Sequence, residues 1–239
     1  MQRKITFSVG EFYHLYNRGV EKRTIFLNEK DRARFHKLIY LANSTNPIKF
    51  RELGDCAFDD IDRGDQLVAI GAYVLMPNHF HFLVKEIVKN GLSRFMEKLS
   101  TGYSMYFNKK YERVGPLFQG RFKGEHVDND RYLKYLYAYI HLNPVKLIEP
   151  NWKETGIKDK KRALKYISQY YYSSYEDYCG GKRKEAIFLS KNEFPLYFSK
   201  THDFKMYIND WLMFEKIKAR TYRGRPSVSS GALGKSLFF

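Results

Sequence analysis

The chain has 239 residues, of which 44% are hydrophobic and 17% aromatic, and it carries 42 Lys and Arg against 26 Asp and Glu. This much apolar sequence excludes a disordered chain, and the longest apolar runs are too short for a membrane-spanning helix, which needs about 18 residues. A net charge of +16 predicts a polyanionic partner, nucleic acid before a membrane surface, and an N-terminus without an apolar signal region predicts a cytoplasmic protein.

The first half of the chain predicts a strand, a helix and a hairpin. Residues 11–18 are rich in strand formers, and Asn28 begins a helical pattern that ends near Asn43. Residues 66–75 read as a second strand. Pro77-Asn78 then turns the chain into a third strand, so we expect an antiparallel hairpin.

The following segment predicts two more helices around a short strand. A helix should run from Asn90-Gly91 to about Asn108, followed by a basic loop and a strand at 122–127. A further helix, capped by one of the residues 128–130, should stop at Pro144. The order strand–helix–strand–strand–helix–strand is that of a ferredoxin-like (RRM-like) α+β sandwich, with helices on one face of an antiparallel sheet and one helix appended.

Composition changes after Pro150. We expect a catalytic domain at 1–150 and a mainly helical accessory region at 151–239, with a helix at 204–217 and a flexible basic tail from 222. The two cysteines, Cys56 and Cys179, form no Cys-x-x-Cys pair. Neither a disulfide framework nor a zinc knuckle is therefore predicted.

His79 and His81 stand one residue apart in the third strand. Strand side chains alternate, so both imidazoles should project from one face, roughly 7 Å apart along the backbone. Two such imidazoles can share one metal ion. A pair of half-exposed strand histidines without a ligand is the competing interpretation, and Phe80 and Phe82 should face the core in either case.

Tyr139 and Asn143 are four residues apart in the last core helix and share a helix face. An activated tyrosine can form a covalent phosphoester, and the Asn143 amide oxygen could be a third metal ligand. Two imidazoles and an amide oxygen suit Mg²⁺ or Mn²⁺ better than a closed zinc site. Tyr132 and Tyr135 lie on neighbouring helix faces, so spacing alone does not choose the nucleophile.

Three segments, residues 76–84, 115–122 and 139–145, resemble the signature blocks of the REP-associated tyrosine transposases, which belong to the single-tyrosine HUH (IS200-like) transposases. Residues 13–19 resemble the first strand of that family. The matches follow one another in order between residues 10 and 150, which makes them far more specific than His-x-His alone. Residues beyond 150 match loosely, around 173–175.

The resemblance implies an enzyme that nicks and rejoins single-stranded or hairpin (REP-like) DNA through a 5′-phosphotyrosine intermediate, with a divalent metal. It assigns the metal to His79 and His81, the nucleophile to Tyr139 and the helix-borne third ligand to Asn143. Relatives outside this branch generally carry Gln at that last position. Two-fold pairing is usual in the broader class, so a homodimer is compatible with the resemblance.

The basic residues near these blocks are candidate phosphate contacts, and together they predict a steep salt dependence of DNA binding. A Gln-Gly-Arg turn at 119–121 could wrap a phosphate with its amides and guanidinium. The DNA-binding candidates are Arg18, Arg94, Lys98, Lys109, Lys110, Arg113, Gln119, Arg121 and Lys123.

Three other histidines have weaker claims, and two of them, His126 and His141, could be drawn into the metal site. We expect His14 to be structural, and His141, which should point away from Tyr139, to lie at the surface or against DNA. Two further functions compete with the nuclease: a non-catalytic single-stranded nucleic-acid binder on an RRM-like sheet, and a histidine-metal phosphoesterase, which would need more carboxylate ligands.

Overall fold

The computed structural model describes residues 6–47 and 58–213. Within these ranges one antiparallel sheet has the strand order β2-β3-β1-β4. Together with two helices the strands follow one another as β1-α1-β2-β3-α2-β4, which confirms the predicted ferredoxin-like α+β fold. The strands are β1 (Phe12–Arg18), β2 (Val68–Met76), β3 (His79–Glu86) and β4 (Lys123–His126).

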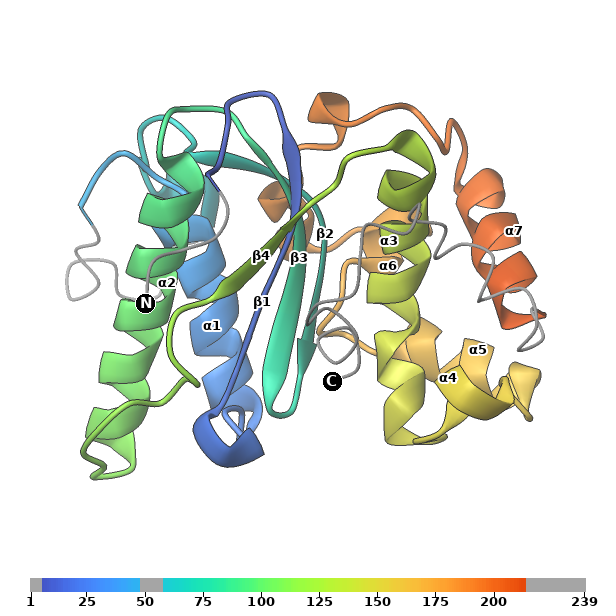
Figure 1. Cartoon of the computed structure of the whole chain (residues 1–239), viewed down its shortest axis with the longest axis horizontal. Coiled ribbons are helices and arrows are strands. Elements are labelled where there is room, and N and C mark those ends of the chain that lie inside the picture. Colours follow the sequence, from blue (N-terminus) through green and yellow to red (C-terminus); the bar gives the residue numbers. More distant parts are fainter. Residues whose placement is uncertain (1–5, 48–57, 214–239) are drawn as a thin grey trace, which may run out of the picture.

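Two helices, α1 (Glu29–Ala42) and α2 (Gly91–Lys110), cover one face of the sheet (Figure 1). The Asn28 side chain caps α1 by accepting a hydrogen bond from the backbone amide of Asp31, as predicted. Apolar side chains of both helices pack against Tyr13, Phe80 and Phe82 of the sheet. This layer is the main hydrophobic core, and it leaves the opposite face of the sheet for polar side chains.

The helix α3 (Asp130–Leu142) lies on that opposite face (Figure 1). Its N-terminus is capped by Asn129, whose side chain accepts from the backbone amide of Tyr132. Its C-terminus passes into a 3₁₀ turn, η4 (Asn143–Leu147), that contains Pro144. Because α3 packs against β2 and β3, the polar side chains of β1 and β4 lie beside the helix rather than under it.

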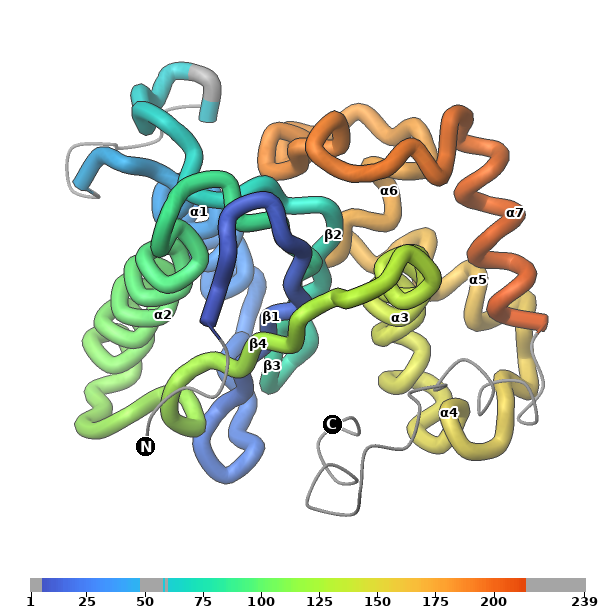
Figure 2. The backbone as a smooth tube through the Cα atoms, turned by 45° about the horizontal axis from the view of Figure 1, so that its top comes forward, coloured from blue at the N-terminus to red at the C-terminus, as the bar shows by residue number. Residues whose placement is uncertain are grey.

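The accessory region packs around the outer side of α3 (Figure 2). It also covers the free edge of β2, because the amide of Leu75 donates to the carbonyl of Tyr172 and the amide of Ser174 donates to the carbonyl of Tyr73. Its helices are α4 (Trp152–Thr155), α5 (Lys160–Gln169), α6 (Tyr175–Tyr178) and α7 (Thr201–Leu212). Further 3₁₀ turns are η1 (Val20–Lys22), η3 (Phe58–Asp60), η5 (Lys184–Phe188) and η6 (Lys191–Glu193).

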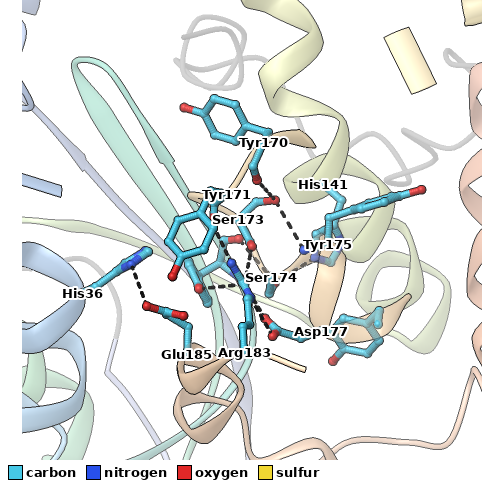
Figure 3. A network of polar contacts seen from close by, with 12 residues as sticks. His36, His141, Tyr170, Tyr171, Ser173, Ser174, Tyr175, Asp177, Arg183 and Glu185 are labelled. Carbon is cyan, nitrogen blue, oxygen red and sulfur yellow. Dashed lines mark hydrogen bonds and ion pairs between the residues drawn. The ribbon is translucent and has the colours of Figure 1, made fainter. Parts of the chain in front are cut away.

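A buried ion pair holds this region to the sheet (Figure 3). The Arg183 guanidinium donates to the Asp177 carboxylate and, at 3.0 Å, to the hydroxyl of Tyr73 on β2. Residues 151–213 therefore share both a hydrophobic cluster and polar contacts with the core. A domain boundary at 150 stays a prediction.

The last predicted helix begins at Thr201 rather than Phe204, because the Asp203 carboxylate accepts from the backbone amide of Lys200 and starts the helix earlier. Residues 214–217 of that prediction, the tail from 222 and Cys56 lie outside the described residues. None of the helices in the described ranges has the length and hydropathy to cross a membrane.

Candidate active site

The polar site is built by strand register on the sheet face that carries α3. β1 pairs with β3 so that Tyr16 lies opposite His81 and Arg18 lies opposite His79. β4 pairs with β1 so that Lys123 lies opposite Tyr16. Side chains directly opposite each other in a sheet share a face. The register therefore gathers the predicted histidine pair and two basic residues on one patch of the sheet.

His79 has its tautomer fixed by Asn78. The Asn78 amide nitrogen donates to the carbonyl of Lys22 at 3.1 Å, which leaves its Oδ1 as the acceptor for His79 Nδ1 at 2.6 Å. Because Nδ1 then carries the hydrogen, the lone pair of His79 lies on Nε2. Nε2 is buried and has no hydrogen-bond partner, as a metal ligand would before the ion binds.

His81 is held by a third histidine, His14 of β1. His14 Nε2 lies 2.9 Å from His81 Nδ1, and the two rings stack with centroids 5.0 Å apart. When His81 donates to His14, the His81 lone pair moves to Nε2, which is also buried and without a hydrogen-bond partner. His14, which we expected to be structural, is thus part of the site.

These imidazoles are neutral over the physiological range. Burial, with the positive charge of Lys153, lowers the pKa of His14 to about 3. Burial also lowers the pKa of His79 to about 3, assisted by the cationic groups of Lys146, Lys153 and Arg18. Burial and the neighbouring His14 hold the pKa of His81 well below its ordinary value. Neutral imidazole is the form that binds metal ions.

Tyr139 of α3 stands edge-on over the histidines. Its ring centroid lies 5.5 Å from that of His81 and 5.6 Å from that of His14. The ammonium of Lys153, from α4, lies 4.3 Å from the centre of the same ring. Burial and Tyr135 raise the pKa of the phenol above its ordinary range, and the Asn143 side chain offsets part of that rise.

The two competing tyrosines make other contacts beside the site. The Tyr132 hydroxyl donates to Glu125 at 3.2 Å, and its ring stacks on Tyr135. Tyr135 packs against Trp211 of α7, with centroids 5.1 Å apart. Of the three candidates, Tyr139 is the one whose ring contacts His81.

Asn143 is fully buried at the end of α3. Its amide nitrogen donates to the carbonyl of Tyr139 at 3.3 Å, while its Oδ1 has no hydrogen-bond partner. No group of three or more His, Cys, Asp or Glu side chains in residues 6–47 and 58–213 could hold a metal ion. The buried atoms without a hydrogen-bond partner include His79 Nε2, His81 Nε2 and Asn143 Oδ1, and imidazole nitrogens and amide oxygens are both ligand types for divalent cations.

Two hollows meet at His79. The smaller, of about 20 Å³, is bounded by His79, His81 and Tyr16, and has room for roughly one water-sized ligand. The larger is a cleft of about 470 Å³ between η1, the turn before β3 and the segment that follows α3. Arg18 and His79 line both, so a ligand in the cleft would reach the imidazoles.

Only part of the predicted DNA-binding set gathers here. Arg18, Gln119 and Lys123 line the small hollow, and the Arg18 guanidinium donates to the Gln119 side chain. In the predicted phosphate-wrapping turn, Asn17 donates to the Gly120 carbonyl at 3.2 Å, and Arg121 is exposed.

The remaining candidates belong to α2 and the loop that follows it. Lys98 donates to the carbonyls of Ser44 and Asn46, each at 2.6 Å, and Lys110 forms an ion pair with the buried Asp31. These two ammonium groups hold α1 and α2 together and are poorly placed to bind a phosphate as well. Arg94 and Lys109 are exposed on α2, and Arg113 donates to Asn108.

The expectation that His141 lies at the surface or against DNA is wrong. The side chain is fully buried, with Nδ1 donating to the Tyr137 carbonyl at 2.8 Å and Nε2 accepting from Ser174 at 2.7 Å (Figure 3). The physical reason is that the accessory region covers this side of α3, which the core sequence alone does not reveal.

Three residues of the site had no functional role predicted from the sequence. Asn78 was assigned only to the turn, although its position directly before His79 is a signal for an imidazole-orienting side chain. His14 alternates with Tyr16 and Arg18 along β1 and so shares their face. Lys153 lies beyond the recognised blocks, and nothing in its neighbourhood of the sequence marks it.

Part of this chain is similar to known transposases. Residues 63–143 match the family model described as transposase IS200 like, and no curated protein matches the chain. A solved structure of a REP-associated tyrosine transposase bound to a REP hairpin is 15% identical over 77% of this chain and 90% of that chain, with a TM-score of 0.49. The family match supports the function of a DNA-cleaving transposase. The resemblance to IS200-like transposases is therefore confirmed over residues 63–143, a stretch that includes His79, His81, Tyr139 and Asn143.

Proposed function

We propose that this protein nicks and rejoins single-stranded or hairpin DNA, with Tyr139 as the nucleophile. The observation that carries the proposal is the position of the Tyr139 ring, edge-on to His81 at 5.5 Å, beside a cleft with cationic side chains at its rim. A phenol next to paired imidazoles and a phosphate-attracting surface suits attack on a phosphodiester.

The chemistry consists of one in-line displacement and its reversal. The Tyr139 phenol loses its proton to water, and its oxygen forms a bond to the scissile phosphorus. The bond from phosphorus to the 3′ oxygen breaks, and that oxygen takes a proton to become a free 3′-hydroxyl. The 5′-phosphotyrosine linkage keeps the energy of the broken bond, so a second 3′-hydroxyl can displace the tyrosine and rejoin a strand.

This chain's own groups favour the step in two ways, which offset the higher pKa that burial gives the Tyr139 phenol. The Lys153 ammonium over the ring stabilises the negative charge that develops on the phenolate. Arg18 and Lys123, at the small hollow, can contact the phosphate oxygens.

Three buried atoms have no hydrogen-bond partner and would hold a divalent ion: His79 Nε2, His81 Nε2 and Asn143 Oδ1. Bound there, Mg²⁺ or Mn²⁺ would withdraw charge from the scissile phosphate. Both imidazoles and the tyrosine come from one chain, so the proposal does not require a partner subunit to complete the site.

The test is covalent capture. Wild-type protein is incubated with end-labelled hairpin oligonucleotides that carry single-stranded tails, with Mn²⁺ or Mg²⁺, and adducts are resolved on denaturing gels and mapped by mass spectrometry. We expect a metal-dependent adduct on Tyr139. The variant Tyr139→Phe should abolish it and retain hairpin binding.

Tyr135→Phe is the matched control, because it removes a hydroxyl from the same helix. It should leave the adduct within about threefold of wild type, since an exposed or partly exposed hydroxyl outside the site contributes little. An adduct that persists in Tyr139→Phe would refute the assignment. Binding without any adduct under either metal would favour the non-catalytic nucleic-acid binder.

A further inference from the structure

The cleft of about 470 Å³ beside His79 is larger than the phosphodiester chemistry needs. The small hollow has room for about one water-sized ligand, whereas the cleft has the volume of a site for a small organic ligand. Its walls come from the turn before β3, from η1, and from η4 with the chain that follows it.

One wall of the cleft is apolar. Its accessible surface comes from Pro77, Leu147 and Pro150, with the buried Met76 behind them. Leu147 is 39% exposed and so gives the cleft an accessible apolar surface. A flat apolar ligand placed against this wall would cover the leucine and remove its surface from water.

The rim of the cleft is cationic. Among the described residues that line it are Arg18, Lys22, Lys146 and Lys153, against the single carboxylate of Glu154. Their field reaches the histidines, because the charges of Lys146, Lys153 and Arg18 all act on His79. A ligand with a flat apolar body and phosphates at its two ends fits this combination of wall and rim.

We propose that the cleft binds one unstacked nucleotide of the DNA strand, adjacent to the scissile phosphate. The base lies on the apolar wall, and its flanking phosphates lie at the cationic rim. Withdrawing a base from its stack into a pocket positions the neighbouring phosphate, and the lost stacking energy is offset by contact with the wall. The adjacency to the scissile phosphate rests on the proposed function, whereas the binding of a nucleotide does not.

A small-probe experiment separates base binding from charge attraction. The probes are thymidine 3′,5′-bisphosphate, 2′-deoxyadenosine 3′,5′-bisphosphate and the abasic deoxyribose bisphosphate of equal charge. They are titrated by calorimetry into the full-length Tyr139→Phe protein in EDTA and low salt, so that neither metal nor cleavage takes part. The methyl resonances of Leu147, which is exposed at the cleft, report whether a base ring lies on the wall.

We expect the base-containing probes to bind at least about fivefold more tightly than the abasic probe, as contact with a base face implies. Leu147→Asn, which keeps the size and charge of the side chain, should reduce that advantage by about threefold. Lys22→Ala and Lys146→Ala should each weaken all three probes by about two- to tenfold at low salt. Lys165→Ala, on the exposed side of α5, is the charge-matched control and should change nothing.

Equal affinity for the abasic and base-containing probes would overturn the proposal, and so would unmoved Leu147 methyl signals on saturation with thymidine 3′,5′-bisphosphate. Circular dichroism shows whether each variant is folded. If Leu147→Asn is unfolded, Pro150→Ser tests the same wall. The outcome is independent of covalent capture. If no covalent adduct forms but the probes bind according to their base, the nuclease is rejected and the nucleotide site is retained. If an adduct forms but the base does not affect probe binding, the nucleotide site is rejected and the nuclease is retained.

Discussion

Replacing His14 by leucine should weaken metal binding without unfolding the protein. His14 Nε2 is the partner of His81 Nδ1 at 2.9 Å, and both side chains are 2% exposed. Leucine fills a similar volume but accepts no hydrogen bond. His81 would then keep a buried Nδ1 without a partner and would lose the contact that places its lone pair on Nε2.

The size of the effect follows from these contacts. Loss of a hydrogen bond that orients a metal-binding histidine typically costs about 10- to 100-fold in metal affinity. The stability cost should be smaller than the usual figure of about 1–3 kcal/mol for an orphaned buried donor. His14 Nδ1 is itself buried without a hydrogen-bond partner, and the substitution removes that penalty together with the ring.

The assay is a Mn²⁺ titration of DNA-free protein, in which electron paramagnetic resonance measures the free ion. His14→Gln can still accept from His81 and should recover most of the affinity. His36→Leu is the matched control, since His36 is also buried but lies on α1 near Glu185. A His14→Leu protein that binds Mn²⁺ as tightly as wild type, or a His36→Leu protein that loses the same affinity, would refute the role assigned to His14.

Three further outcomes are expected. Arg183→Met leaves the fully buried Asp177 carboxylate without its ion pair, so the free energy of unfolding measured in urea should fall by about 3–5 kcal/mol. The double variant that also carries Asp177→Leu should recover most of this loss, and equal losses in the two proteins would contradict the prediction. Burial lowers the pKa of His141 to about 3, below that of the unfolded chain, so unfolded protein binds the proton first as the pH falls. Below about pH 6.5 this histidine should remove up to about 1.4 kcal/mol of stability per pH unit, and a melting temperature that stays constant down to about pH 5 would speak against it. Lys123→Ala should reduce the slope of log K for hairpin binding against log salt concentration by about 0.7–0.9. Lys98→Ala should leave this slope unchanged, because the Lys98 ammonium is bound to carbonyl groups. Equal slopes in both variants would show that Lys123 and Lys98 do not differ in their contact with DNA.

Local patterns predicted the parts of the site that depend on one element at a time. Strand alternation placed His79 and His81 on one face and Phe80 on the other, and the strand pairing agrees. Cap residues located the starts of α1 and α3, because an Asn side chain satisfies free amides wherever a helix begins. These features are fixed within a few residues of chain.

Features that depend on strand register could not be predicted in this way. His14 meets His81 across 67 positions of sequence, and the contact exists because β1 lies between β3 and β4. Likewise, Tyr132, Tyr135 and Tyr139 share neighbouring helix faces, so helical periodicity alone could not choose between them. The position of α3 over β2 and β3, which is a property of packing, brings Tyr139 to the imidazoles.

The burial of His141 ties the nucleophile to the accessory region. A carbonyl oxygen can only accept, so the bond to Tyr137 places the hydrogen of the imidazole on Nδ1 and makes Nε2 an acceptor for the Ser174 hydroxyl. Ser174 also accepts from the backbone amide of Tyr73 on β2 at 2.9 Å. The turn of α3 that carries Tyr139 is therefore joined to the sheet through a residue of the accessory region. The distance between the phenol and the histidines depends on that region, and truncation at residue 150 should disturb the active site as well as the stability of the fold.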